Sequence, residues 1–242
     1  GIVIGSIIGY LIMDVGGLGW QVMVASLFIP LVGYGYLIIG QTFPLTERVE
    51  MGISTKASLK SLFTPLYLFI AVCMLLSATT ELGTTQRIES LLRETGVNAL
   101  LVLAFINGLM MIGRYFAGPI SRKISTTGML WFSALFSFIG LQLLANASGM
   151  FIFIAAGVFA IGVTFFWPTT LAFISENIPE SGAFGLSIMG GLGNLSVSIV
   201  LPVMGRFLDN SNGMQVIQTM STLPAILFVL YGALYYYRKK YN

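Results

Sequence analysis

The acidic residue best placed to do chemistry inside an apolar stretch is Glu81. It follows the apolar run Pro65–Ala78, and Gln86 and several threonines stand beside it in the segment SATTELGTTQRIES. A carboxylate in such a segment is expensive to bury and tends to face a bundle interior or a water-filled cavity. Glu81 is therefore predicted to bind a solute or to take up a proton, with Gln86 as a polar neighbour. The alternative is a helix end at which the glutamate meets water.

Gly83 and the polar residues after it predict a break in this helix. A second piece is expected to run on through Ile88 and Leu92. Broken helices in transporters occur where the backbone lines a binding cavity.

A second set of charges lies at the ends of later apolar segments. Arg114 ends one of them, Arg122 and Lys123 follow it, and Glu176 ends another. An ion pair between Arg114 and Glu176 would latch one face of the protein in one conformational state and break in the other. The alternative is two long side chains that reach water separately.

An aromatic cluster surrounds Trp167 in the sequence FFWPT. Pro168 has no N–H group, so it is expected to kink the helix and to free a carbonyl near residue 164. Trp167 at such a kink suits stacking on a sugar or a planar ligand. Asn107 and Asn194 are single amides in apolar segments; they are expected to form hydrogen bonds across helices, with a ligand contact as the alternative.

The elements that must position these residues are helices that cross a membrane. Residues 124–175 contain no Asp, Glu, Lys or Arg, and only 9% of the whole chain is charged. Because about 20 apolar residues cross a bilayer as a helix, that stretch holds two crossings. The sequence predicts an all-α membrane protein with about eight transmembrane helices, over residues 1–13, 19–40, 65–83, 97–117, 128–146, 150–174, 184–204 and 216–236.

The basic residues predict the orientation of these helices. Lys and Arg are retained on the cytoplasmic side. If the polar interval 41–64 is cytoplasmic, nine of the twelve basic residues lie inside, and only Arg87, Arg93 and Arg206 lie outside. The C-terminus is then cytoplasmic, and the interval 41–64 is expected to be a partly helical linker at the membrane surface.

The rare residue types exclude several kinds of site. The chain has no histidine, which excludes His-based zinc sites, haem ligation by His and any Ser-His dyad. We expect no cofactor, no metal site and no enzymatic activity. The net charge of +3 indicates no nucleic-acid partner, because the basic residues stand at helix ends.

Three stretches resemble the major facilitator superfamily of transporters. They are the long loop 41–64 that separates two helices from six, the basic glycine-containing loop GRYFAGPISRKIS (Gly113–Ser125), and FFWPTTLAFISENIPESGAFGLS (Phe165–Ser187). Arg122 stands where that loop usually has an aspartate. The motif FWPTT, followed by a Gly-rich helix that ends in LPVMG, is similar to the fucose and related sugar:proton symporter branch.

The resemblance implies the domain organisation. Residues 1–40 would be the end of an N-terminal bundle with a truncated first helix, 41–64 the cytoplasmic interdomain loop, and 65–242 the C-terminal six-helix bundle. Glu81, Gln86, Asn107, Trp167 and Asn194 would face a central cavity. Arg114, Glu176, Arg122 and Lys123 would form the cytoplasmic gate.

The function implied is secondary active transport. We expect symport of a sugar or similar polar metabolite with a coupling ion, by default a proton, across a bacterial inner membrane, by a protein that is monomeric at full length. The alternatives are a drug or metabolite efflux antiporter and a membrane receptor that does not transport.

Overall fold

The computed structural model describes residue 8 and residues 11–44, 52, 54–121 and 123–241. Every regular element in these residues is a helix, so the predicted all-α class is confirmed. The chain divides into two compact units, residues 1–45 and residues 46–242. The first unit contains the π-helical turn η1 (Leu11–Val15) and the helices α2 (Trp20–Ala25) and α3 (Phe28–Ile38).

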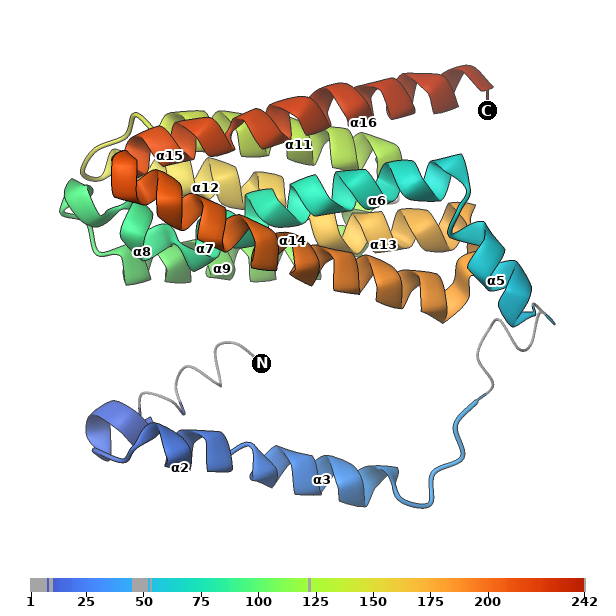
Figure 1. The fold of residues 1–242 in the computed structure, drawn as a ribbon, viewed down its shortest axis with the longest axis horizontal. Helices are drawn as coiled ribbons and strands as arrows, with labels where there is room; N and C mark the ends of the chain where they lie inside the picture. The colour runs from blue at the N-terminus through green and yellow to red at the C-terminus, as the bar shows by residue number, and fades with distance from the viewer. Residues whose placement is uncertain (1–7, 9–10, 45–51, 53, 122, 242) are drawn as a thin grey trace. The chain divides into compact units, whose positions relative to one another are not determined.

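The second unit is a helical bundle (Figure 1). Its elements are α5 (Thr55–Ser61), α6 (Pro65–Ala78), η2 (Thr79–Gly83), α7 (Thr84–Gln86), α8 (Ile88–Leu91), η3 (Arg93–Thr95), α9 (Ala99–Tyr115), α10 (Ala117–Ser121), α11 (Thr126–Leu144), α12 (Phe151–Val163), α13 (Phe166–Asn177), η4 (Pro179–Ser181), α14 (Gly182–Asn210), α15 (Gly213–Met220) and α16 (Thr222–Tyr241).

Six helical segments of the described chain are long and apolar enough to cross a membrane. They are Trp20–Ile38, Pro65–Gln86, Thr126–Leu144, Phe151–Asn177, Pro179–Asn210 and Gly213–Lys240. The protein is therefore a multi-pass α-helical membrane protein, and its described residues contain six full-length spans where eight were predicted over the whole chain. The segment predicted over residues 97–117 is α9, which has only 17 residues, and most of residues 1–13 lie outside the described part.

Side-chain caps fix where several of these helices begin. The Thr64 hydroxyl accepts a hydrogen bond from the backbone N–H of Tyr67 and precedes Pro65, a residue suited to the first helical turn. Asn98 caps α9 by accepting from the N–H groups of Leu100 and Leu101. Polar residues in the gaps between apolar runs therefore set the helix starts.

Helix α6 lies at the centre of the bundle, where it contacts α13, α14 and α16, while α11 packs against both α12 and α16. Helices α11 and α12 approach closely because Gly162 has no side chain. A Cβ atom on Gly162 would lie 2.3 Å from the backbone nitrogen of Ser137. Small residues at such contacts let the backbones of two helices approach closely. Close packing matters in a membrane because lipid tails are as apolar as the side chains and give no hydrophobic driving force for helix association.

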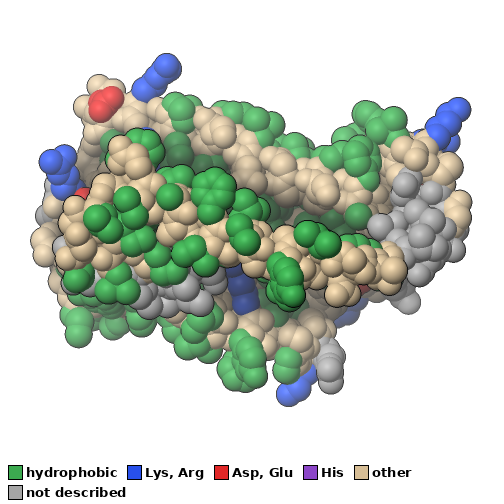
Figure 2. Space-filling view, turned by 90° about the horizontal axis from the view of Figure 1, so that it is seen from below, with side chains coloured by type: hydrophobic (Ala, Val, Ile, Leu, Met, Phe, Trp, Pro, Cys, Tyr) green, Lys and Arg blue, Asp and Glu red, His purple; other side chains and the backbone are tan. Residues whose placement is uncertain are grey.

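Charged side chains sort to the two ends of the bundle. One end carries α5, the start of α11, the junction of α13 and α14, and the end of α16 (Figure 1). The side chains of Lys56, Lys60 and Lys123 belong to this end, as does the basic run that closes α16. Arg87 and Arg206 belong to the opposite end. Figure 2 shows many hydrophobic side chains and only a few charged ones on the surface in view.

The interval predicted as a linker divides between the two units. Residues 55–61 form α5, which confirms that the interval is partly helical, and α5 packs on η4 and α14 of the bundle. The middle of the interval, residues 45–51 and 53, lies outside the described residues.

Candidate functional site

Glu81 occupies a widened turn in the last third of a continuous helix. Residues Thr79–Gly83 form the π-helical turn η2 between α6 and α7, and the helix runs unbroken from Pro65 to Gln86. The predicted break lies four residues after Gly83, at Arg87, where φ is −109° and ψ is 9°, and the predicted second piece is α8 (Ile88–Leu91). A π-turn inside an α-helix is frequently found at functional sites.

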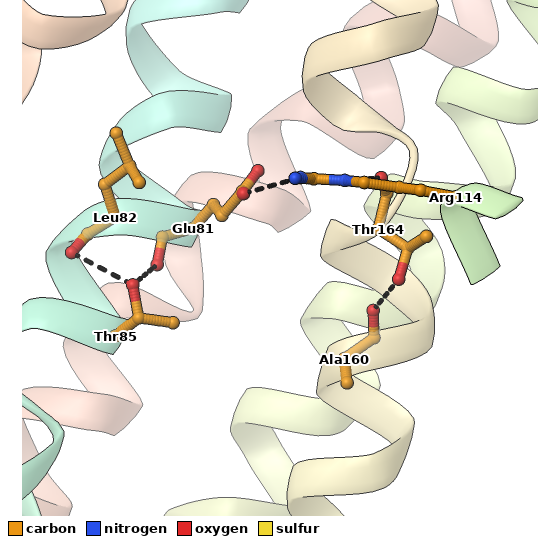
Figure 3. A network of polar contacts seen from close by, with 6 residues as sticks. All are labelled: Glu81, Leu82, Thr85, Arg114, Ala160 and Thr164. Carbon is orange, nitrogen blue, oxygen red and sulfur yellow. Dashed lines mark hydrogen bonds and ion pairs between the residues drawn. The ribbon is translucent and has the colours of Figure 1, made fainter. Parts of the chain in front are cut away.

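Glu81 forms an ion pair with Arg114 of α9. The guanidinium Nη2 donates to Glu81 Oε1 over 2.9 Å, and the two side chains extend toward each other from their helices (Figure 3). The Glu81 side chain is only 7% exposed, whereas that of Arg114 is 41% exposed. This is the single ion pair recorded between side chains of the described residues. It joins a buried anion to a cation that still reaches the surface of the unit.

Arg114 is held from a second direction by a backbone carbonyl. Its Nε donates to the Thr164 carbonyl oxygen over 3.0 Å. That carbonyl is available because residue 168, four positions on, is a proline and has no N–H to offer it. Helix α12 accordingly ends at Val163, and α13 begins at Phe166. The carbonyl predicted to be freed near residue 164 is therefore confirmed, and it fixes the guanidinium that faces Glu81.

The second carboxylate oxygen of Glu81 has no protein partner. Oε2 is buried and accepts no hydrogen bond from any described residue. The Thr85 hydroxyl, one turn away, donates to the backbone carbonyl of Glu81 and leaves the carboxylate alone. A buried carboxylate oxygen without a donor is costly and implies a water, a proton or a ligand as its partner. The site thus combines a guanidinium held by two acceptors with one buried carboxylate oxygen that has no donor among the described residues.

The structure changes where two of the predicted residues lie. Glu81 is not at a helix end, since the helix continues for five residues, about 8 Å of rise, as far as Gln86. The guanidinium of Arg114 contacts Glu81 and the Thr164 carbonyl, so it lies between η2 and the junction of α12 and α13. Glu81, which was predicted for the central cavity, and Arg114, which was predicted for the cytoplasmic gate, therefore form one site.

The predicted pair of Arg114 and Glu176 is not formed in this structure. Glu176 is exposed and accepts a hydrogen bond from the Thr126 hydroxyl at 3.1 Å. Lys123 is also exposed at that end of the bundle, and Arg122 lies outside the described residues.

The remaining predicted residues do not gather around Glu81. Gln86 and Asn194 are exposed, and Asn107 is half-buried. Their predicted hydrogen bonds across helices are wrong for the two asparagines, because each amide donates to a carbonyl of its own helix, Asn107 to Leu103 and Asn194 to Gly190. Asparagine side chains commonly bond to the backbone of the preceding turn in this way.

Trp167 packs against the backbone of α14. A Cβ atom on Gly193 would lie 2.5 Å from Cζ3 of the indole, so the ring rests directly on this glycine. The structure therefore gives Trp167 a packing contact, and the half-buried ring keeps part of its surface open. The ring and Gly193 together tie α13 to α14.

Sequence reasoning missed a group of buried hydroxyl and thiol side chains on, and packed against, the helix that carries Glu81. Ser77 and Cys73 precede Glu81 by one and two turns on the same face of the helix, and the Tyr231 hydroxyl of α16 lies beside Ser77 and Thr170. All four side chains are buried. The four-residue spacing of Cys73, Ser77 and Glu81 was the signal available in the sequence.

Comparisons with known proteins do not identify a family for this chain. No protein-family model matches the chain, and no curated protein or solved structure matches it significantly. The proposed function therefore rests on the geometry around Glu81 and Arg114.

Proposed function

We propose that this chain forms the working part of a secondary active transporter of the major facilitator type, which moves a small polar organic solute by alternating access with proton symport. The observation that supports the proposal is the buried ion pair of Glu81 and Arg114, set at a π-turn and at a proline-interrupted helix. Charges inside a membrane are costly and tend to mark substrate or ion pathways. Irregular helices within a membrane protein tend to line such pathways.

In this mechanism the ion pair has two exclusive arrangements. Arg114 binds Glu81 in one state, and the solute or a proton replaces the guanidinium at the carboxylate in the other. The buried position of Glu81 makes an unpaired carboxylate unfavourable, so loss of Arg114 and gain of a proton are expected to occur together. The guanidinium is 41% exposed, so water can solvate its Nη2 group when it releases Glu81, while its Nε keeps the bond to the Thr164 carbonyl.

The proposal also sets location and orientation. We place the protein in a bacterial inner membrane, with the α5 end of the bundle and the C-terminus in the cytoplasm. In this orientation the lysine-rich end of the bundle, which carries Lys56, Lys60 and Lys123, lies on the side on which Lys and Arg are retained. A sugar or similar metabolite is the first substrate class, because the polar side chains on the helix that carries Glu81 are mostly hydroxyls, such as Ser77, Thr80 and Thr84.

An apolar cavity supports efflux antiport as the second candidate. A cavity of about 330 Å³ lies beside Thr164, and side chains such as Leu109, Ile112 and Phe132 line it. A cavity of this kind takes an apolar compound better than a sugar. The two candidates therefore differ in the solute that the protein should move.

Uptake into proteoliposomes tests both candidates. The protein would be expressed from its complete coding sequence and offered labelled sugars, polar metabolites and hydrophobic cations under an imposed pH gradient. Symport predicts gradient-driven uptake of one polar solute, and efflux antiport predicts that only the hydrophobic cations move. Failure of every solute to move with folded protein in the membrane would refute transport and favour a receptor.

The residue test uses two acids of the same region. Glu81→Gln is expected to abolish uphill uptake while downhill exchange survives. Glu89→Gln changes an exposed acid of α8 and is the matched control, which should leave uptake unchanged. Equal effects of the two substitutions would refute a special role for Glu81.

A further inference from the structure

A second cavity lies between the start of α11 and the end of α16, at the lysine-rich end of the bundle. Its volume is about 310 Å³. The residues that line it are Ser125, Thr126, Thr127, Tyr235, Arg238 and Lys239. Three hydroxyl side chains on one wall therefore face two cationic side chains on the other.

Arg238 is held in place by two contacts. Its guanidinium donates to the side-chain oxygen of Asn177 and lies over the ring of Phe173, with 5.5 Å between Cζ and the ring centroid. An arginine fixed in this way keeps further N–H groups for a ligand, and its planar fork matches the oxygens of a phosphate group. Lys239 is exposed and adds a second positive charge.

One acid stands near this cavity. Glu176 accepts the hydrogen bond of the Thr126 hydroxyl, so its carboxylate lies on the hydroxyl wall. Arg238 and Lys239 line the cavity, whereas Glu176 does not. The charge that faces the cavity is therefore positive, and an anion is its complementary ligand.

The residues around the cavity favour an anion that is part of a membrane lipid. The cavity lies at the level where the span Thr126–Leu144 begins and the span Gly213–Lys240 ends. Tyr235 lines it and also stacks on Trp131, with ring centroids 5.4 Å apart, and Phe228 stacks on Trp131 at 5.3 Å. Trp and Tyr are enriched at the membrane–water interface, where they contact headgroups and the first acyl carbons. The aromatic stack of Tyr235, Trp131 and Phe228 therefore extends from the cavity along α11 and α16.

We propose that this cavity binds the phosphate headgroup of an anionic phospholipid, with Arg238 and Lys239 as its cationic ligands and the Trp131 stack against its acyl chains. Basic pockets between transmembrane helices on the cytoplasmic side bind anionic lipid headgroups in this manner. The lipid joins α11 to α16 and the end of α13, so it stabilises one end of the bundle. This site is separate from the Glu81 site and does not depend on a transport function.

Native mass spectrometry of the purified protein tests the proposal. The protein would be titrated with phosphatidylglycerol and with phosphatidylcholine of the same acyl chains. Tighter retention of phosphatidylglycerol is expected, and Lys239→Gln should weaken it about fivefold, the worth of one cation near a membrane surface. Lys239 is exposed, so this substitution is expected to leave the fold intact.

Lys60→Gln is the control, because Lys60 is an exposed lysine of α5 and does not line the cavity. It should leave lipid retention unchanged. Equal retention of the two lipids, or equal losses in the two lysine variants, would overturn the proposal. Displacement of phosphatidylglycerol by inorganic phosphate at low millimolar concentration would assign the cavity to a soluble phosphate compound instead.

Discussion

The ion pair of Glu81 and Arg114 predicts an asymmetric response to the loss of either partner. Replacing Arg114 by Gln leaves a carboxylate that is 7% exposed without its cation. Replacing Glu81 by Gln leaves a guanidinium that is 41% exposed and that keeps its bond to the Thr164 carbonyl. The first change should therefore destabilise the protein more than the second.

The magnitudes follow from the geometry. Two unit charges about 4 Å apart attract by about 4 kcal/mol at an effective dielectric constant near 20. Removing one partner of a fully buried pair costs about 3–5 kcal/mol, and the exposure of Arg114 lowers this toward 3 kcal/mol for Arg114→Gln. Glu81→Gln retains a neutral acceptor for the guanidinium, so it should cost about 1 kcal/mol.

Equilibrium unfolding in mixed micelles, with the two single variants and the double variant, measures these free energies. The double variant should cost at least about 1 kcal/mol less than the sum of the single variants, since each single change removes the same interaction. Arg206→Gln changes an exposed arginine at the far end of the bundle and should shift the unfolding free energy by less than about 0.5 kcal/mol.

Two results would refute this reasoning. The first is a cost for Arg114→Gln no larger than that for Glu81→Gln, which would mean that Glu81 is not desolvated. The second is additivity of the two substitutions within about 0.4 kcal/mol, which would mean that the side chains do not interact.

Three further substitutions test the local geometry. Pro168→Ala supplies an N–H for the Thr164 carbonyl, so melting temperature should hold or rise while solute uptake falls several-fold; unchanged uptake would count against the role of this carbonyl. Gly193→Ala drives a methyl group into the Trp167 ring and should cost about 1–3 kcal/mol of unfolding free energy, with the loss recovered in a Trp167→Leu background; no recovery would show that another contact is responsible. Gly191→Ala meets open space, and its unfolding free energy should stay level or rise by up to about 1 kcal/mol.

The apolar segments could be predicted from the sequence because lipid imposes a simple rule. Each crossing must satisfy its own backbone and expose apolar side chains, so charge-free runs such as residues 124–175 identify helices directly. The freed carbonyl could also be predicted, since it depends only on the missing N–H of Pro168. Both conclusions rest on local chemistry.

The partners of charged groups could not be predicted in the same way. Glu81 and Arg114 are separated by 33 residues, and the contact depends on the depth at which each helix sits. The predicted spans 65–83 and 97–117 contain η2 and α9, but hydropathy alone does not say how far one helix is shifted along the other. The amides of Asn107 and Asn194 were likewise assigned to neighbouring helices, although carbonyls of their own helices were closer partners.

Solute-induced proton movement tests the central proposal most directly. Proteoliposomes in a lightly buffered medium would receive the transported solute while an external dye reports pH. The account predicts a solute-dependent rise in external pH with the unmodified protein and none with Glu81→Gln, although the variant still exchanges solute. A rise of the same size with Glu81→Gln, or solute uptake by the unmodified protein without any proton movement, would contradict it.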